Sequence, residues 1–151
     1  MVRALSAQDG DSARALVQSA YGGTRHLMRA LELLESALTG NDPGCLGLAC
    51  TAGDGRHDGV LLYGTIGGAA GVIKVHELVG AVEALAPLIG GVRRVTSARD
   101  ARMFICELSN AVEHLLASRA LASHGFTCEA RIADYFADGI SLEVLALRVD
   151  A

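Results

Sequence analysis

The 151-residue sequence lacks a long apolar run, both near its first residues and further along. Its first five residues lead directly to Asp9 and Asp11, without the apolar stretch of a secretory signal. No charge-free run approaches the roughly 18 residues that a membrane-spanning helix needs. We therefore expect a cytoplasmic protein without a membrane partner.

Clusters of basic residues are also missing. The formal net charge is −4 and the pI is near 5.7, and the arginines are scattered or paired. Such a chain offers no positive surface to a phosphate backbone, so we do not expect nucleic acid as a partner.

Paired cysteines are absent as well. Cys45, Cys50, Cys106 and Cys128 contain no Cys-x-x-Cys pair and lie in apolar segments. A free cysteine in such surroundings behaves as a small buried hydrophobic residue. The spacing therefore predicts four reduced thiols, no disulfide and no metal site.

What the sequence does contain is enough apolar material for a core. Hydrophobic residues make up 51% of the chain and charged residues 20%, which argues against disorder. The length is typical of one domain, and no repeat, linker or low-complexity segment divides it. We interpret residues 1–151 as a single domain.

The N-terminal part of the chain predicts a strand followed by two helices. Residues 2–6 suit a short strand, and Asp9 and Asp11 offer N-cap chemistry for a helix that ends at Gly22. Four further leucines recur at helical spacing and predict a second amphipathic helix, which stops at Gly40.

The middle of the chain predicts three paired strands. Residues 45–52, 60–66 and 72–79 are apolar or alternating stretches separated by glycine-rich turns. The glycine run at residues 67–71 leads into a strand instead of a helix N-terminus, so we interpret it as a turn and not as a phosphate-binding loop.

A further helix is expected within residues 82–99, where the apolar residues keep helical spacing. Pro87 lacks a backbone N–H and Gly90-Gly91 have low helix propensity. We therefore expect these residues to interrupt the helix, and the position of its beginning stays open.

The remaining elements are a strand, a helix and a closing strand pair. Residues 102–108 suit the strand, and Asn110 can cap a helix that ends before Gly125. Residues 126–132 and 142–149 suit the strand pair. This order predicts a mixed sheet covered by helices on both faces, in the α/β (α+β) class.

The last third of the chain resembles the Gcn5-related N-acetyltransferases (GNAT). A strand with Glu107 leads through a helix to Gly125-Phe126, and residues 130–139 then read Ala-Arg-Ile-Ala-Asp-Tyr-Phe-Ala-Asp-Gly, similar to the family's Asp-Tyr-Tyr-x-x-Gly turn. Residues 64–79 resemble the family's third and fourth strands. The resemblance implies a mostly antiparallel central sheet of about six to seven strands flanked by about four helices, with Phe126 buried.

The resemblance also implies an activity. The family transfers an acetyl group from acetyl-CoA to an amine and holds the coenzyme in a V-shaped gap between its fourth and fifth strands. Here those strands are residues 72–79 and 102–108. We accordingly expect an N-acetyltransferase with acetyl-CoA as co-substrate and a small-molecule or peptide amine as acceptor, and a homodimer is an assembly that we leave open.

The resemblance places candidate site residues near the ends of these two strands. Glu77 is the first candidate for the base that takes a proton from the amine, and Glu107 is the second. A solvated or ion-paired strand-end residue is the alternative for both. The coenzyme contacts are expected at Leu78, Val79, Gly80, Ala81 and Asn110.

Two departures from the family pattern affect this reading. The family binds pyrophosphate with an Arg/Gln-x-x-Gly-x-Gly/Ala loop at a helix N-terminus. The corresponding residues are 80–84 or, in a shifted register, 88–91, and neither reproduces the motif; Glu83 also adds negative charge. The tyrosine that acts as the general acid in many relatives is replaced by Leu121, so we assign no acid.

These departures keep a second function open. A degenerate GNAT fold that has lost catalysis and serves as an interaction or ligand-sensing module is the alternative to the enzyme. A structural oligomerisation domain of unrelated fold is a third hypothesis, which a sheet without a splayed pair of central strands would favour.

Overall fold

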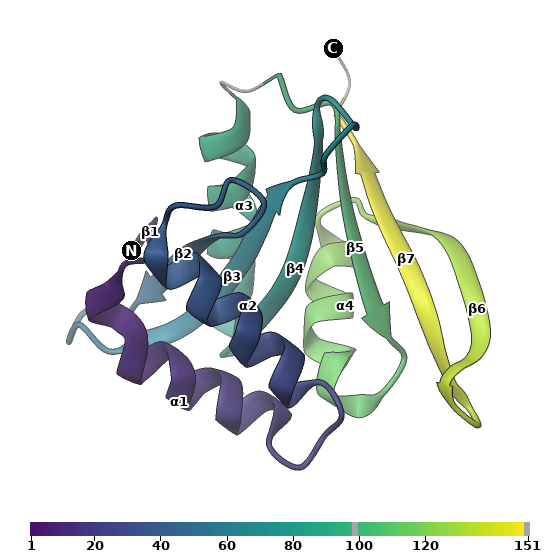
Figure 1. Cartoon of the computed structure of the whole chain (residues 1–151), viewed down its shortest axis with the longest axis horizontal. Coiled ribbons are helices and arrows are strands. Elements are labelled where there is room, and N and C mark those ends of the chain that lie inside the picture. The colour runs from purple at the N-terminus through teal and green to yellow at the C-terminus, as the bar shows by residue number, and fades with distance from the viewer. Residues whose placement is uncertain (98–99, 150–151) are drawn as a thin grey trace.

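The computed structural model describes residues 1–97 and 100–149, which form one seven-stranded sheet with helices on both faces (Figure 1). The strands are β1 (Val2–Ala4), β2 (Leu46–Thr51), β3 (His57–Thr65), β4 (Val72–Gly80), β5 (Met103–Ser109), β6 (Thr127–Ala137) and β7 (Ile140–Arg148). Their order in the sheet is β1-β2-β3-β4-β5-β7-β6. The β4–β5 pair is parallel and the other pairs of described strands are antiparallel, so the predicted class and sheet are confirmed.

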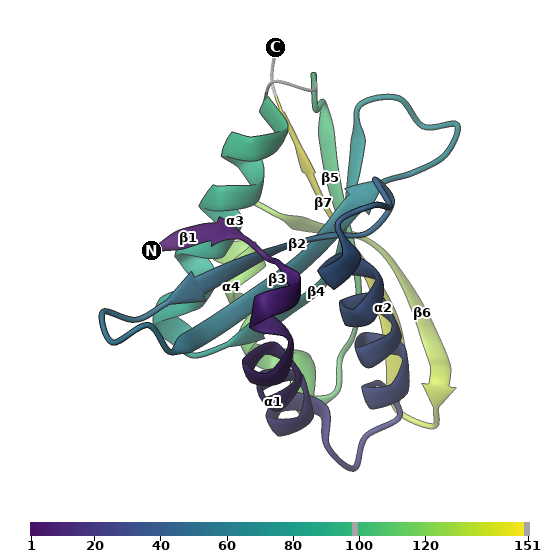
Figure 2. The same cartoon turned by 60° about the vertical axis from the view of Figure 1, so that its left-hand side comes forward.

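The helices form two layers. Helices α1 (Gly10–Tyr21) and α2 (Leu27–Thr39) cover one face of the sheet, and α3 (Val82–Ser97) and α4 (Leu115–Ser123) cover the other (Figures 1 and 2). Two single 3₁₀ turns, η1 (Ala7–Asp9) and η2 (Val112–His114), precede α1 and α4. No helix among the described residues is long and apolar enough to cross a membrane.

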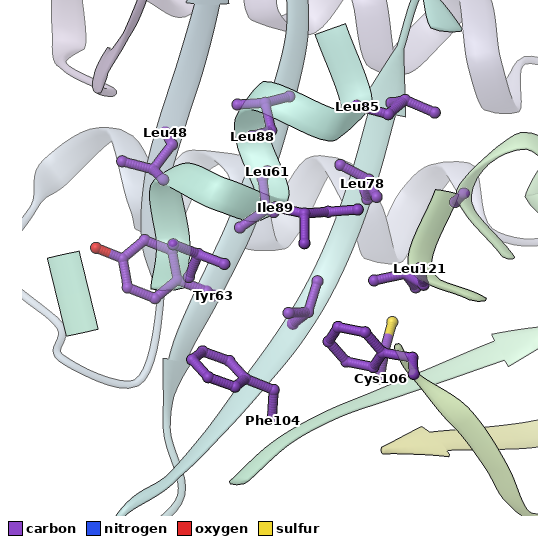
Figure 3. Close-up of a cluster of buried hydrophobic side chains, with 14 of the residues drawn as sticks. Leu48, Leu61, Tyr63, Leu78, Leu85, Leu88, Ile89, Phe104, Cys106 and Leu121 are labelled. Atoms are coloured by element: carbon purple, nitrogen blue, oxygen red, sulfur yellow. The ribbon is translucent and has the colours of Figure 1, made fainter. Parts of the chain in front are cut away.

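Each helical layer has its own apolar core, because successive strand residues point to opposite faces of the sheet. In β3, Leu61 packs toward α3 and α4, whereas Val60 and Leu62 pack toward α1 and α2. Figure 3 shows the core between the sheet and helices α3 and α4, to which Leu61 and Phe104 from the strands and Leu88 from α3 belong. The two cores hold the sheet between the helices.

The predicted elements of the N-terminal half are confirmed, with small shifts of their bounds. The helix α2 ends at Gly40, whose φ of 65° is the left-handed conformation that favours glycine. The Gly125 and Phe126 predictions are also confirmed: Gly125, which follows the C-cap residue of α4, has a φ of 90°, and Phe126 is buried.

The prediction that Pro87 and Gly90-Gly91 interrupt their helix is wrong. Helix α3 runs without a break from Val82 to Ser97 with Pro87 inside it; residues 98 and 99, which we also expected in this helix, lie outside the described residues. A proline inside a helix costs about 3 kcal/mol, whereas one fully buried aliphatic side chain contributes about 1.5–3 kcal/mol. The buried side chains of α3 outweigh the proline: Leu85, Leu88, Ile89 and Val92.

Neither Asp9 nor Asn110 caps a helix with its side chain, although Asp9 does occupy the N-cap position of α1. The Asp9 carboxylate accepts hydrogen bonds from the Ser6 N–H and from Arg3, and its side chain does not cap α1. Asn110 does not cap α4, because its side-chain oxygen accepts from the Ser141 N–H at 2.9 Å. Asp9 is the last residue of the 3₁₀ turn η1, and η2 lies between Asn110 and α4.

The expectation of four buried cysteines is correct for three of them. Cys45, Cys50 and Cys106 are buried free thiols, whereas Cys128 is a free thiol exposed to solvent. Cys128 lies on β6, the last strand of the sheet order, where a side chain lacks a covering layer.

Candidate active site

The central feature of the molecule is the place where β4 and β5 part. Their pairing begins at Val72 and Met103 and ends at Val75 and Cys106, although both strands continue beyond these residues. Beyond this point β4 remains paired with β3 and β5 remains paired with β7. The two ribbons diverge as the family resemblance implied, which confirms the V-shaped separation (Figure 1).

A β-bulge accompanies the divergence. Leu62 of β3 pairs with Glu77, but the next residue, Tyr63, pairs with Val75, so His76 is an additional residue in β4. A bulge bends its strand and changes the direction of the side chains that follow it. Glu77 consequently faces α1, where it contacts Tyr21.

The divergence leaves a cavity of about 420 Å³ between the end of β4, the C-terminal half of α1 and the beginning of α4. Four of the expected coenzyme-contacting residues line it together: Leu78, Val79, Gly80 and Ala81. Asn110 does not line this cavity. Its amide group contacts the β6–β7 turn at Gly139 and Ser141 instead.

A second cavity of about 400 Å³ lies between α3 and α4 and shares Leu85 and Leu116 with the first. Arg119 and His124 of the α4 segment line it. Sequence reasoning missed Arg119, which it treated as one of several scattered arginines. The sequence feature that could have identified Arg119 is its spacing of three residues from Leu116 in a predicted helix, because this spacing puts both side chains on one face.

The beginning of α3 identifies the position of the unusual loop. Helix α3 starts at Val82, directly after β4 ends at Gly80. The register with residues 80–84 therefore lies at a helix N-terminus, and the alternative register is wrong because residues 88–91 lie inside α3. The Ala81 N–H donates to the Asp58 carbonyl at 2.8 Å, and Glu83 lies in the first turn.

Glu77 is held in an apolar setting. Its Oε2 accepts a hydrogen bond from the Tyr21 hydroxyl at 2.7 Å, and only 9% of the residue is exposed. Burial raises the pKa of Glu77 to about 7, and the hydrogen bond from Tyr21 opposes this rise. Glu77 does not line the first cavity, whereas Leu78, the next residue of β4, does.

Glu107 has a different environment. Its carboxylate forms an ion pair with Lys74 of the neighbouring strand, with 2.7 Å between Lys74 Nζ and Glu107 Oε2. The Glu107 side chain is 43% exposed. The two candidate bases therefore differ in both burial and charge partner.

A buried polar cluster lies at the end of β5, around Ser109 and His114. The Ser109 N–H donates to His114 Nδ1, which must therefore be unprotonated, and the Ser109 hydroxyl lies 2.7 Å from the same atom. Burial lowers the pKa of His114 to about 4. His26 Nε2 lies 3.4 Å from Ser109 Oγ and 3.5 Å from Glu113 Oε1.

Aromatic rings connect this cluster to β6. The His26 ring centroid lies 4.4 Å from that of His114 and 5.3 Å from that of Phe136, and Tyr21 packs edge-on against His114. Arg25 also donates to the Phe136 carbonyl. The α1–α2 loop is thereby joined to the end of β6.

Sequence reasoning did not identify Tyr21, His26 or Glu113 as site residues. Tyr21 ends α1, His26 lies in the loop before α2 and Glu113 lies in η2, so these residues meet only through tertiary packing. The described residues contain no group of three or more histidine, cysteine, aspartate or glutamate side chains placed to hold a metal ion.

Comparison with known proteins identifies the architecture. No protein-family model and no curated protein matches the sequence. Solved structures do match: a protein of Desulfovibrio desulfuricans described as a GNAT acetyltransferase is 21% identical, with a TM-score of 0.84 and 99% of each chain covered. The fold is that of the Gcn5-related N-acetyltransferases.

Two other GNAT structures show the same likeness at lower identity. The aminoglycoside 6′-N-acetyltransferase of Enterococcus faecium is 9% identical, with a TM-score of 0.79 over 100% of this chain and 98% of that one. A Salmonella typhimurium acetyltransferase solved with acetyl-CoA is 14% identical, with a TM-score of 0.75 over 100% and 94%. At such identities the likeness concerns the GNAT fold.

Proposed function

We propose that this protein is an N-acetyltransferase that moves an acetyl group from acetyl-CoA to an amine. The observation that carries the proposal is the cavity at the β4–β5 divergence of a GNAT fold, lined by the end of β4. The matching Salmonella typhimurium structure contains acetyl-CoA, which supports the same co-substrate here. A small-molecule or peptide acceptor, a cytoplasmic location and a homodimer remain predictions.

The end of β4 suits the uncharged part of the coenzyme. We propose that the main chain of Leu78, Val79, Gly80 and Ala81 binds pantetheine. Acetyl-CoA supplies the acetyl group as a thioester that an unprotonated amine attacks. The backbone N–H groups of the strand can donate to the thioester oxygen as negative charge develops on it.

Glu77 is our first candidate for the base. A base works best when its pKa is near the working pH, and the pKa of about 7 fits this requirement. Neither Glu77 nor Tyr21, whose hydroxyl donates to it at 2.7 Å, lines the cavity, so a proton would reach Glu77 through a water molecule. Glu107 is the second candidate, although the ion pair with Lys74 holds its carboxylate.

The second cavity offers a place for the phosphates of the coenzyme. We propose that Arg119 provides the cation there that the loop at residues 80–84 lacks. Glu83 in the first turn of α3 opposes an anion at that helix N-terminus. We therefore expect weak but detectable binding of acetyl-CoA, with most of the affinity coming from pantetheine.

Calorimetry with acetyl-CoA and with S-acetylpantetheine tests whether pantetheine provides most of the affinity and Arg119 contacts the phosphates. Replacing Arg119 by alanine should weaken acetyl-CoA binding by about tenfold, since a charge-assisted hydrogen bond contributes about 1.5–3 kcal/mol, and should leave S-acetylpantetheine unaffected. Arg93→Ala, which removes an exposed charge from the other end of α3, is the matched control. Release of the coenzyme thiol in the presence of a simple amine measures transfer.

The outcomes separate the hypotheses. Micromolar or tighter binding that depends on the phosphates, and that Arg119→Ala does not change, would contradict our interpretation of the loop. Absence of binding at millimolar acetyl-CoA would favour the alternative function, a ligand-sensing or interaction module without catalysis. The structural feature behind this alternative is that α3 begins immediately after β4, with no glycine loop between them.

A further inference from the structure

Glu113 lies between the cavity at the end of β4 and the buried polar cluster around Ser109 and His114. Among the described residues that line this cavity it is the charged one, and it lies opposite the end of β4. On its other side, Oε1 is 3.5 Å from His26 Nε2. Glu113 therefore stands between the proposed coenzyme site and the α1–α2 loop.

The carboxylate of Glu113 has little to compensate its charge. Its side chain is 14% exposed, and no lysine or arginine forms an ion pair with it in the described part of the chain. Burial is the main cause that lowers the pKa of His26, so this neighbour is neutral near pH 7. A distance of 3.5 Å is also longer than a good hydrogen bond. A partly desolvated carboxylate in this position is unfavourable without a cation.

The surroundings indicate which cation would fit. On the side away from the cavity the Glu113 carboxylate faces the His26 ring, whose centroid lies 4.4 Å from that of His114 and 5.3 Å from that of Phe136, so the open approach to the carboxylate is from the cavity. Pantetheine carries no charge and does not need a carboxylate, while the coenzyme phosphates would be repelled by one. The remaining candidate is the protonated amine of the acceptor.

We infer that Glu113 binds the ammonium group of the acceptor, a protonated aliphatic amine, beside the thioester position at the end of β4. This inference rests on the proposed function and goes beyond it by naming the group that holds the acceptor. It also gives separate roles to Glu113 and Glu77. Glu113 touches the acceptor, and Glu77, which lies outside the cavity together with Tyr21, remains the candidate base.

Binding of a simple probe tests the inference without requiring turnover. Protein labelled with ¹³C at glutamate carboxyl carbons is titrated with n-butylammonium chloride at constant ionic strength, and with n-butanol as the uncharged analogue. The Glu113 resonance, identified by its loss in Glu113→Gln, should shift and saturate with butylammonium and stay unchanged with butanol. A resonance that does not shift, or that responds equally to both compounds, overturns the inference.

A matched variant excludes a general effect of lost charge. Glu143 has a side chain of similar exposure, 13%, but its carboxylate is paired with Arg131 at 2.7 Å. Glu113→Gln should weaken butylammonium binding by about tenfold or more, the effect of one lost charge-assisted hydrogen bond, and Glu143→Gln should leave it unchanged. Equal weakening by both variants contradicts the site.

Turnover with butylamine as acceptor gives a second readout. Glu113→Gln should raise KM for butylamine by a similar factor and leave acetyl-CoA binding unchanged, and Glu113→Asp, which keeps the charge, should recover part of the loss. If the wild-type protein transfers no acetyl group, the proposed function fails, while the ¹³C titration still decides whether Glu113 binds an ammonium group.

Discussion

Glu77 is a buried acid whose charge opposes folding. Its pKa is about 7 in the folded protein against 4.5 for an ordinary glutamate, because burial disfavours the carboxylate. The folded state therefore binds the proton more tightly than the unfolded state does. Stability contributed by this group is present at low pH and is lost as the pH rises from 4.5 to about 7.

Replacing Glu77 by glutamine removes this dependence. We expect Glu77→Gln to unfold at similar or lower urea concentration than wild type at pH 5, and to be more stable than wild type at pH 8 by up to about 3 kcal/mol. His114 also titrates in this range, but it is present in both proteins and cancels from the difference. Urea denaturation of both proteins at several pH values measures the difference in their free energy of unfolding.

The control for this prediction is the exposed candidate base. Glu107→Gln removes a carboxylate that is 43% exposed, so the difference from wild type should stay within about 1 kcal/mol at every pH. A Glu77→Gln difference that does not change between pH 5 and pH 8 would contradict the raised pKa.

For single residues, the sequence predicts the candidate side chains of the site but not their contacts. Glu77 was identified from its place at a strand end, but its contact with Tyr21 joins residues 56 positions apart and depends on the bulge at His76. Glu113 and His26 meet across a still longer separation in the chain. Local pattern indicates which side chains can act chemically, and only tertiary packing decides which of them share a cavity.

At the scale of single elements, the end of β4 requires a glycine. Gly80 has a φ of 145°, and a Cβ atom there would lie 2.4 Å from the Asp58 carbonyl oxygen. The same carbonyl accepts the hydrogen bond from the Ala81 N–H, so it cannot easily move away. The close approach of these two strands fixes the point at which α3 begins.

Gly80→Ala should therefore be strongly destabilising. We expect a loss of about 2 kcal/mol or more, from backbone strain and the clash together, with weaker acetyl-CoA binding. Gly53→Ala is the matched control, because a Cβ atom at Gly53 meets nothing within 4 Å. Urea denaturation of the three proteins measures the effect, and equal stability of the two variants would contradict the requirement for glycine at the end of β4.

Elements with a strong local pattern were predicted well, and those decided by distant partners were not. Helix α2 and the strands of the central meander follow from apolar spacing and glycine turns. Pro87 is tolerated because α3 buries a stripe of aliphatic residues against the sheet. Asn110 was expected at a helix cap, but the β6–β7 turn, some 30 residues later, takes up its side chain.

At the scale of the whole molecule, the sheet separates two apolar cores, and each of them contains buried cysteine. Cys45 belongs to the core beneath α1 and α2, whereas Cys50 and Cys106 belong to the core beneath α3 and α4. Burial raises the pKa of the thiols of Cys45 and Cys106, which keeps them in the unreactive thiol form. Cys128 is exposed on the edge strand β6.

Thiol alkylation should consequently report the opening of both cores. In the native protein we expect Cys128 to react at once and the three buried thiols to react slower by about a thousandfold or more, because they become accessible only when the structure opens. Mass spectrometry of the digested protein assigns the rates. If the cores unfold together, Cys45, Cys50 and Cys106 share one rate. Fast labelling of any buried cysteine in the native protein would contradict the packing of the core that contains it. A separate thiol count of the unfolded, unreduced protein should find four free thiols. A count of two or fewer would contradict the reduced state.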